Sequence, residues 1–454
     1  MTSNPDWLDE IDRELSRLRE AEARLYYDAD CGAALDAKAL SEIARQRHAI
    51  LTDPSLTREA DALARDDAPA TRRKAQLLTL NALAARLDDD ETLAALRLEL
   101  DRTQRSMGRE MRTTDGLRRY LGATEKCARE SIRIANAIAR REGFEGYPSA
   151  KLACQELSPG GLMRTLADAH VAFASECRSA IAGIDAGAMT EGQLDRAVTA
   201  AQTPDGDGFP TDGKVAAVRT TLALAGFDFD RLPIKTEERE LPYPGAVHTL
   251  KIGADMRIVI DGNKGGFTSY ALLFHEVGHA VYYAYCPDST LLLDNRIGRE
   301  GLAEMWARLV ETQEWLRTIA RLNEGAICEL LDRQRRFHGY MMMTFVRDAL
   351  FELAVYREPD ADFAAIWRRV TADCLGVDDT TGTYTQFIFL YPMDIKDYVY
   401  AHLIGESVLA DLAGRFEGSV LRDGVVEFLG ERYYRQGNAA PWHERIPAFS
   451  RARQ

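Results

Sequence analysis

The chain contains 454 residues, with 57 Lys and Arg against 71 Asp and Glu, which gives a formal net charge of −14. This acidic balance provides no overall positive field, so we expect neither nucleic acid nor an anionic membrane surface as a partner. With 46% hydrophobic and 28% charged residues, the composition is that of a folded globular chain and excludes a disordered or membrane-embedded one.

The N-terminal segment predicts a location inside the cell. Acidic residues occur among the first ten positions, and no apolar stretch has the length of a signal peptide or a spanning helix. We therefore expect a cytoplasmic protein. The seven cysteines stand singly, without a C-x-x-C pair, which is typical of reduced thiols.

The first 200 residues predict a helical lobe. They are rich in Ala, Leu, Arg and Glu, which are strong helix formers. Helices are expected at about 36–50, 56–67, 70–87, 90–110, 114–143 and 160–185. In the opening segment, Leu8, Ile11, Leu15 and Leu18 recur at helical spacing. This seam is short for a coiled coil, so packing inside the protein is favoured over binding of a partner helix.

A small sheet is predicted at 241–263. Turn residues alternate there with short β-rich runs, notably 256–260, and helical texture then resumes to the end of the chain. The expected fold is mainly α, with two helical lobes, a cleft, and one small β-sheet beside the helix that carries the motif described next. The N-terminal lobe would cover 1–200 and the catalytic lobe 215–454, with one shared core.

Residues 275–279 read His-Glu-Val-Gly-His within a predicted helix at 268–286. His275 and His279 are one turn apart on one side of that helix, where two imidazoles can ligate one Zn²⁺ at ~2.0–2.1 Å. Glu276 lies beside them and can accept a proton from a zinc-bound water. This division of labour is typical of H-E-x-x-H metallopeptidases.

A catalytic zinc requires a third protein ligand, which the sequence offers on a predicted helix at 300–321. Glu304 lies 25 residues after His279 in a run with helical apolar spacing. Glu300 is the competing candidate, but it lies beside a Gly-containing turn, where a helix N-terminus would favour a negative charge. We therefore predict one zinc per chain, held by His275, His279 and Glu304.

A predicted Tyr-rich helix at 392–413 carries candidate hydrogen-bond donors. Tyr391, Tyr398 and His402 fall on one stripe at helical spacing. A phenol or imidazole there could stabilise a developing oxyanion. Tyr400 points roughly the opposite way on an ideal helix, although distortion could bring it in. The alternative is that these side chains belong to the core, with their polar atoms satisfied.

Taken together, these motifs resemble the zinc oligopeptidases of the thimet oligopeptidase and oligoendopeptidase F family, which are related to angiotensin-converting enzyme. The resemblance rests on HEVGHA, on the glutamates at 304 and 311, on ADMRIVIDGN at 254–263, and on FLYPMDIKDYVYAHLIGESVLADL at 389–412. The segment at 254–263 is similar to an edge strand that lies along bound peptide in the family.

The resemblance also implies roles for individual residues. His248 occupies the place of a substrate-binding histidine, and with the 256–260 strand it would hold a substrate backbone by β-augmentation. Tyr391 and Tyr400 would contact substrate, and Tyr398 and His402 would stabilise the oxyanion. The chain departs from the family pattern at Met393, where a histidine is expected, and at His402, where tyrosine is more common.

The sequence thus predicts a zinc metallopeptidase that hydrolyses short peptides with Glu276 as general base. Two alternatives stay open. One is a zinc-dependent amidohydrolase that tailors a non-standard peptide or a small-molecule amide. The other is a catalytically silent relative that only binds peptides. The sequence does not distinguish cleavage inside a peptide from cleavage at its end.

Overall fold

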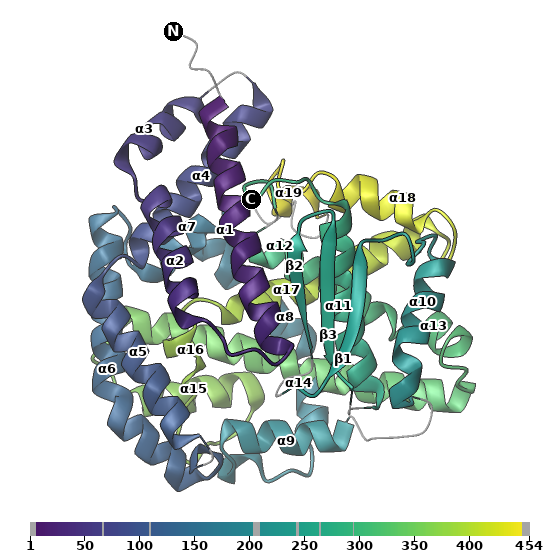
Figure 1. Cartoon of the computed structure of the whole chain (residues 1–454). Helices are drawn as coiled ribbons and strands as arrows, with labels where there is room; N and C mark the ends of the chain where they lie inside the picture. Colours follow the sequence, from purple (N-terminus) through teal and green to yellow (C-terminus); the bar gives the residue numbers. More distant parts are fainter. Residues whose placement is uncertain are drawn as a thin grey trace. The chain divides into compact units, whose positions relative to one another are not determined.

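The computed structural model describes residues 6–65, 68–108, 110–202, 209–241, 245–262, 265–293 and 295–446. Helices dominate these residues, and one three-stranded sheet accompanies them (Figure 1). The prediction of a mainly α protein with one small sheet is confirmed. Among the described residues, no helix combines the length and the apolar character needed to cross a bilayer.

The chain divides into two compact units, each built from segments that are far apart in the sequence. Unit 1 comprises Met1–Ala82, Asp205–Cys328 and Ala401–Gln454, and unit 2 comprises Leu83–Pro204 and Glu329–Tyr400. Three of the four divisions fall inside α4 (Pro69–Leu87), α14 (Glu324–Arg357) and α17 (Ile395–Arg415), and the fourth, at 204/205, lies outside the described residues. The sequence instead predicted two contiguous lobes, because it does not reveal that a chain returns to a unit it has left.

The remaining elements of unit 1 carry the sheet and most of the predicted site. Its helices are α1 (Asp6–Asp30), α2 (Ala37–Leu51), α3 (Pro54–Leu63), α10 (Lys214–Leu224), α11 (Phe267–Tyr285), α12 (Arg296–Leu309), α13 (Gln313–Thr318), α18 (Val425–Leu429) and α19 (Trp442–Arg445), with short turns η3 (Thr211–Gly213) and η4 (Gly430–Tyr434).

All regular elements among the described residues of unit 2 are helices. Its elements are α5 (Glu91–Met107), η1 (Glu110–Arg112), α6 (Thr114–Arg141), α7 (Tyr147–Cys154), α8 (Pro159–Ile181), η2 (Ala186–Ala188), α9 (Glu191–Gln202), α15 (Phe363–Leu375) and α16 (Phe387–Leu390). Side-chain caps fix several of the helix starts. Asp90, Thr113 and Ser158 accept hydrogen bonds from the backbone N–H groups of Leu93, Gly116 and Gly161, as N-cap residues do.

The apolar seam of α1 packs inside unit 1. Leu8 and Leu15 are buried in a cluster with residues of α3 and α4, namely Ala60, Leu63, Ala75 and Leu78, and with Leu291 from the loop between α11 and α12. The favoured interpretation of this seam, packing within the protein, agrees with these contacts. Burial of each such side chain contributes about 1.5–3 kcal/mol to the free energy of folding.

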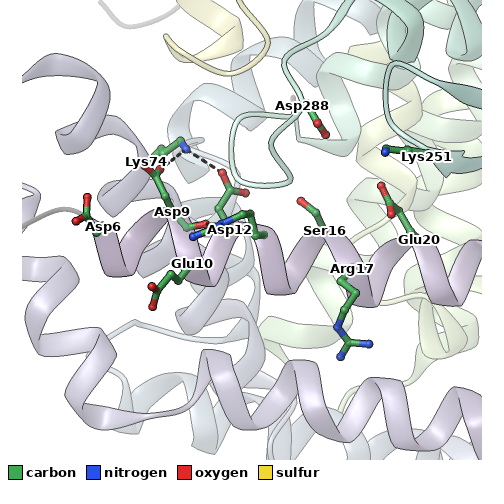
Figure 2. Close-up of a pocket in the computed structure, with 11 residues that line it drawn as sticks. Asp6, Asp9, Glu10, Asp12, Ser16, Arg17, Glu20, Lys74, Lys251 and Asp288 are labelled. Carbon is green, nitrogen blue, oxygen red and sulfur yellow. Dashed lines mark hydrogen bonds and ion pairs between the residues drawn. The ribbon is translucent and has the colours of Figure 1, made fainter.

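Polar contacts also attach α1 to the loop that follows α11. Lys74 bonds to Asp9 at 2.8 Å and to Asp12 at 3.0 Å (Figure 2). Asp12 is buried and accepts hydrogen bonds from the Ser289 hydroxyl at 2.5 Å and from the backbone N–H of Leu291 at 3.0 Å. The first helix therefore holds the connection between the two helices that carry the predicted metal ligands.

The sheet has the strand order β1-β3-β2, with β3 in the centre (Figure 1). Strand β1 (Ile234–Arg239) pairs with β3 (Asp255–Asp261) in parallel, and β2 (Gly245–Lys251) pairs with it antiparallel. Helix α11 packs against β2 and β3. Residues 242–244 and 263, within the predicted sheet segment, lie outside the described residues.

The prediction that 256–260 forms an edge strand is wrong. Both sides of β3 are already hydrogen-bonded, so it has no free edge to receive a peptide strand. The error arises because β1 has the sequence IKTEER, in which charged residues hide the apolar alternation that usually marks a strand. His248 lies on β2, which is an edge strand.

The functional helices begin and end close to the expected positions, with three differences. Helix α11 runs from Phe267 to Tyr285, against the predicted 268–286. The predicted helix 300–321 is two helices, α12 and α13, because Thr312 caps a new start at α13. Helix α17 starts at Ile395 and not at 392, since Met393 adopts a left-handed φ of 63°.

The buried carboxyl of Glu352 supports the left-handed backbone of Met393 in unit 2. Glu352 is 1% exposed, and its Oε1 accepts a hydrogen bond from the Met393 N–H at 2.6 Å. Burial raises the pKa of Glu352 to about 8, although the Met393 bond and Lys396 lower it. The folded protein therefore holds this side chain as a neutral acid at pH 7.

We predict that Glu352 makes unit 2 less stable as the pH rises. The pKa of Glu352 is about 8 in the folded state and ~4.3 in the unfolded state. Its contribution to the free energy of unfolding is therefore complete below about pH 4 and is lost by about pH 8. Glu352→Gln mimics the neutral acid. In denaturant unfolding at pH 5 and pH 8, its stability should exceed that of the wild type by more at pH 8 than at pH 5. The difference between the two pH values should be at least about 1.4 kcal/mol, the equivalent of one pKa unit.

The control is the exposed Glu358, which directly follows the end of α14. Glu358→Gln should leave the pH dependence of stability unchanged. Equal loss of stability between pH 5 and pH 8 in the Glu352→Gln variant and the wild type would show that this carboxyl is not the source.

Candidate metal centre

The candidate site is built on the close packing of α11 against α12 in unit 1. Gly278 of the H-E-x-x-H motif lies at the contact, where a Cβ would come within 2.7 Å of the Ala303 Cα and 2.8 Å of the Trp306 ring. Only a residue without a side chain permits this approach. The two helices therefore face each other closely enough for side chains from both to share one ligand.

The side chains of His275, His279 and Glu300 converge across this contact. One carboxylate oxygen of Glu300, Oε2, lies 3.3 Å from His275 Nε2 and 3.6 Å from His279 Nε2. Ligand atoms of these three residues all lie within 4.8 Å of one another. The two imidazoles meet edge to face, with ring centroids 4.8 Å apart.

This geometry fits a metal ion held by two imidazoles and one carboxylate. Tetrahedral ligands at ~2.0–2.1 Å from zinc are about 3.3–3.4 Å apart, which is close to the distances from Glu300 Oε2 to the two nitrogens. Two histidines and one glutamate are a common ligand set for catalytic zinc, with the fourth position left for water. The three residues can therefore hold one divalent cation.

The electrostatics of the cluster fit the same interpretation. Burial lowers the pKa of His275, but the carboxylates of Glu300 and Glu304 outweigh burial and raise it to about 10. The pKa of Glu300 lies well below its ordinary value: burial opposes ionisation, but the two histidines outweigh it. In the metal-free protein, a proton on His275 thus balances part of the carboxylate charge, and a bound cation would displace it.

Glu276 follows His275 directly on α11. Burial raises its pKa above the ordinary value, whereas the charges of His279 and His275 lower it. A partly desolvated carboxylate next to a metal position is suited to accept and return a proton. The structure thus retains the second chemical element of the H-E-x-x-H motif beside the ligands.

Glu304, predicted as the third ligand, lies next to this group and faces different atoms. Its Oε2 is 3.6 Å from Nδ1 of His275, the ring nitrogen opposite to the one that faces Glu300. Its Oε1 is 2.6 Å from His402 Nδ1. Burial raises the pKa of Glu304, but His402, His275 and Arg308 outweigh burial and hold it well below its ordinary value.

His402 is brought to the centre by the contact between α17 and α12. A Cβ at Gly405 would lie 2.9 Å from the Glu304 Cγ, so the two helix backbones approach at this position. The buried Arg308 lies 3.1 Å from His402 Nδ1 through its Nη2. The sequence predicted His402 near the zinc but did not indicate a role for Arg308. Arg308 follows Glu304 by four residues on α12, a spacing that predicts an ion pair between them.

His248 is buried on β2 and contacts α1. Its Nε2 lies 2.6 Å from Asp30 Oδ2, and its ring meets Tyr27 edge to face. His248 is also among the groups that lower the pKa of Glu276, and its strand β2 packs against α11. Asp30 was not expected from the sequence, because a carboxylate at the end of an N-terminal helix carries no motif that links it to residue 248.

The three tyrosines of the predicted donor group lie in unit 2. Tyr391 is 52% exposed and packs on Phe387, Tyr398 stacks on Phe345 with ring centroids 5.4 Å apart, and Tyr400 is buried with a hydrogen bond to Thr165. Burial raises the pKa of Tyr400. The roles predicted for these residues remain predictions.

Comparisons with known proteins identify the fold. No model of a known protein family matches the chain, and no curated protein matches it. Among solved structures, the chain is similar to an M32 carboxypeptidase from Deinococcus radiodurans R1, with a TM-score of 0.65 and 17% identity over 98% of this chain and 95% of that chain.

Two further structures give the same result. A Pyrococcus furiosus carboxypeptidase has a TM-score of 0.68 and 14% identity over 97% of this chain and 95% of its own. Trypanosoma cruzi metallocarboxypeptidase 1 has a TM-score of 0.67 and 14% identity over 98% and 95%. The chain thus has the fold of helical metallocarboxypeptidases. These names are those of carboxypeptidases and not of the oligopeptidases that the motifs resemble.

The ligand geometry predicts that metal binding depends on both helices. Purified protein should bind about one zinc per chain, and His279→Ala or Glu300→Gln should each reduce zinc content severely, because each removes one of three ligands. Elemental analysis after dialysis measures this. Full zinc retention in the Glu300→Gln protein would exclude Glu300 as a ligand.

Proposed function

We propose that the protein is a zinc-dependent metallopeptidase that acts on short peptides. The observation that carries the proposal is the convergence of His275, His279 and Glu300 on one point, with Glu276 next to it. When bound there, zinc would polarise the scissile carbonyl and lower the pKa of a coordinated water toward ~7. The metallocarboxypeptidase fold supports the same class of chemistry.

The chain's own residues supply the proton transfers. Glu276 accepts the proton of the attacking water and returns it to the leaving amine, which is general acid–base catalysis by one carboxylate. Its buried position keeps its proton affinity above that of an exposed glutamate. His248, near Glu276 and fixed by Asp30, lies where the resemblance places a substrate-binding histidine, and we propose that it contacts the substrate.

The carboxypeptidase names of the similar structures support one mode of cleavage. We propose that this chain also removes residues from the C-terminus of a peptide. Peptides of identical sequence with a free or an amidated C-terminus test this directly. Mass spectrometry should show stepwise shortening of the free peptide and little change in the amidated one. Equal cleavage of both would indicate internal cleavage, as in oligopeptidases.

We predict that Glu276→Gln removes activity and preserves the metal. The substitution is nearly isosteric but cannot accept the proton, so turnover of the free peptide should fall by ~10²-fold or more. Zinc content and thermal unfolding should match the wild type. An active Glu276→Gln enzyme would rule out this mechanism, and activity on small-molecule amides without peptide cleavage would favour the amidohydrolase alternative.

We also predict different effects for the two tyrosines near the start of α17. If Tyr398 donates to the oxyanion, Tyr398→Phe should lower kcat by ~10²-fold with little change in KM. Tyr400 is buried against Thr165, so Tyr400→Phe should mainly reduce stability, by about 1 kcal/mol. Steady-state kinetics and denaturant unfolding of both variants check this. The reverse outcome would reassign the donor to Tyr400.

A further inference from the structure

We propose that Glu304 is a positioning residue that orients two imidazoles at once, the metal ligand His275 and the neighbouring His402. This inference rests on the proposed metal centre. It gives Glu304 a role distinct from that of a ligand, because its carboxylate faces the Nδ1 atoms of both rings.

The contact with His275 fixes which ring nitrogen faces the metal position. His275 Nε2 lies 3.3 Å from Glu300 Oε2, and His275 Nδ1 lies 3.6 Å from Glu304 Oε2, on the opposite side of the ring. A carboxylate at Nδ1 favours a proton on that nitrogen and leaves the Nε2 lone pair for a metal. His279 has no such support, since its buried Nδ1 has no hydrogen-bond partner among the described residues.

The contact with His402 uses the second oxygen of the same carboxylate. Glu304 Oε1 lies 2.6 Å from His402 Nδ1, whereas Arg308 Nη2 lies 3.1 Å from that nitrogen. Arginine can only donate and carboxylate can only accept, so the two neighbours favour opposite tautomers. The shorter distance assigns the Nδ1 proton of His402 to a hydrogen bond with Glu304.

Arg308 holds the carboxylate in place. Its Nε donates to Glu304 Oε1 at 3.1 Å, and its Nη1 donates to Glu311 at 3.3 Å. The side chain of Arg308 is 8% exposed, so these bonds form in a largely dry environment, where they are strong and directional. The close approach at Gly405 restricts Glu304 from the side of α17. The carboxylate is thus fixed relative to both rings.

Zinc affinity provides the first test. We expect Glu304→Gln to bind one zinc per chain with ~10–100-fold weaker affinity, the usual effect of losing a carboxylate behind a ligating histidine. The matched control is Glu311→Gln, which removes the other carboxylate that accepts a hydrogen bond from Arg308, and which should change affinity less than ~3-fold. Competition with a chromophoric chelator measures both.

The tautomer of His402 provides a readout that does not involve zinc. In zinc-free protein with ¹⁵N-labelled histidine, the His402 signals, assigned by comparison with His402→Gln, should show a proton on Nδ1. Glu304→Gln should shift the population toward a proton on Nε2, because Arg308 then donates to Nδ1. Glu311→Gln should leave the spectrum unchanged.

Two outcomes would overturn the proposal. Unchanged zinc affinity together with an unchanged His402 tautomer in Glu304→Gln would show that Glu304 orients neither ring. Complete loss of zinc, equal to that of Glu300→Gln, would make Glu304 a ligand. If the Gln variant does not fold, Glu304→Asp, which retracts the carboxylate, should show the same two changes. If the wild type binds no zinc, the proposed function fails, and the tautomer measurement still decides the His402 contact.

Discussion

The candidate metal centre depends on one packing contact, the approach of α11 to α12 at Gly278. A side chain at this position would collide with Ala303 and Trp306, and the helices would separate by more than a shared ligand allows. With glycine there, a single oxygen of Glu300 reaches both imidazoles. The approach of α17 at Gly405 follows the same principle. Two positions without a Cβ thus set the distances between three helices.

Close approach concentrates charge, and the site is stable because each charge has a partner. Burial of an isolated carboxylate is costly, and removal of one partner from a buried pair costs about 3–5 kcal/mol. Here the carboxylates of Glu300 and Glu304 face imidazoles, and Arg308 lies behind Glu304. The same charges that stabilise the metal-free fold as ion pairs can exchange protons for a cation, which couples folding to metal binding.

The connection between the ligand helices is held by the two ends of the chain. Asp12 of α1 binds the loop after α11, and the Leu292 carbonyl accepts a hydrogen bond from the Asn438 N–H at 2.5 Å. Arg73 of α4 donates to the Asn438 carbonyl and side chain. These contacts span hundreds of residues, so no local pattern predicts them. They explain why unit 1 is assembled from three separate segments.

The sequence by itself determined the features that depend on the geometry of a single helix. It predicted the helical character, and it placed His275, Glu276 and His279 together, since spacing on one helix fixes their relative positions. Only tertiary structure decided which glutamate faces the Nε2 atoms: Glu300 does so, whereas Glu304 faces Nδ1 of His275. They lie one turn apart on α12, and which of them faces the Nε2 atoms depends on how α12 is rotated against α11, a property of packing between helices. The same reason applies to β3, whose central place depends on its pairing with a distant strand.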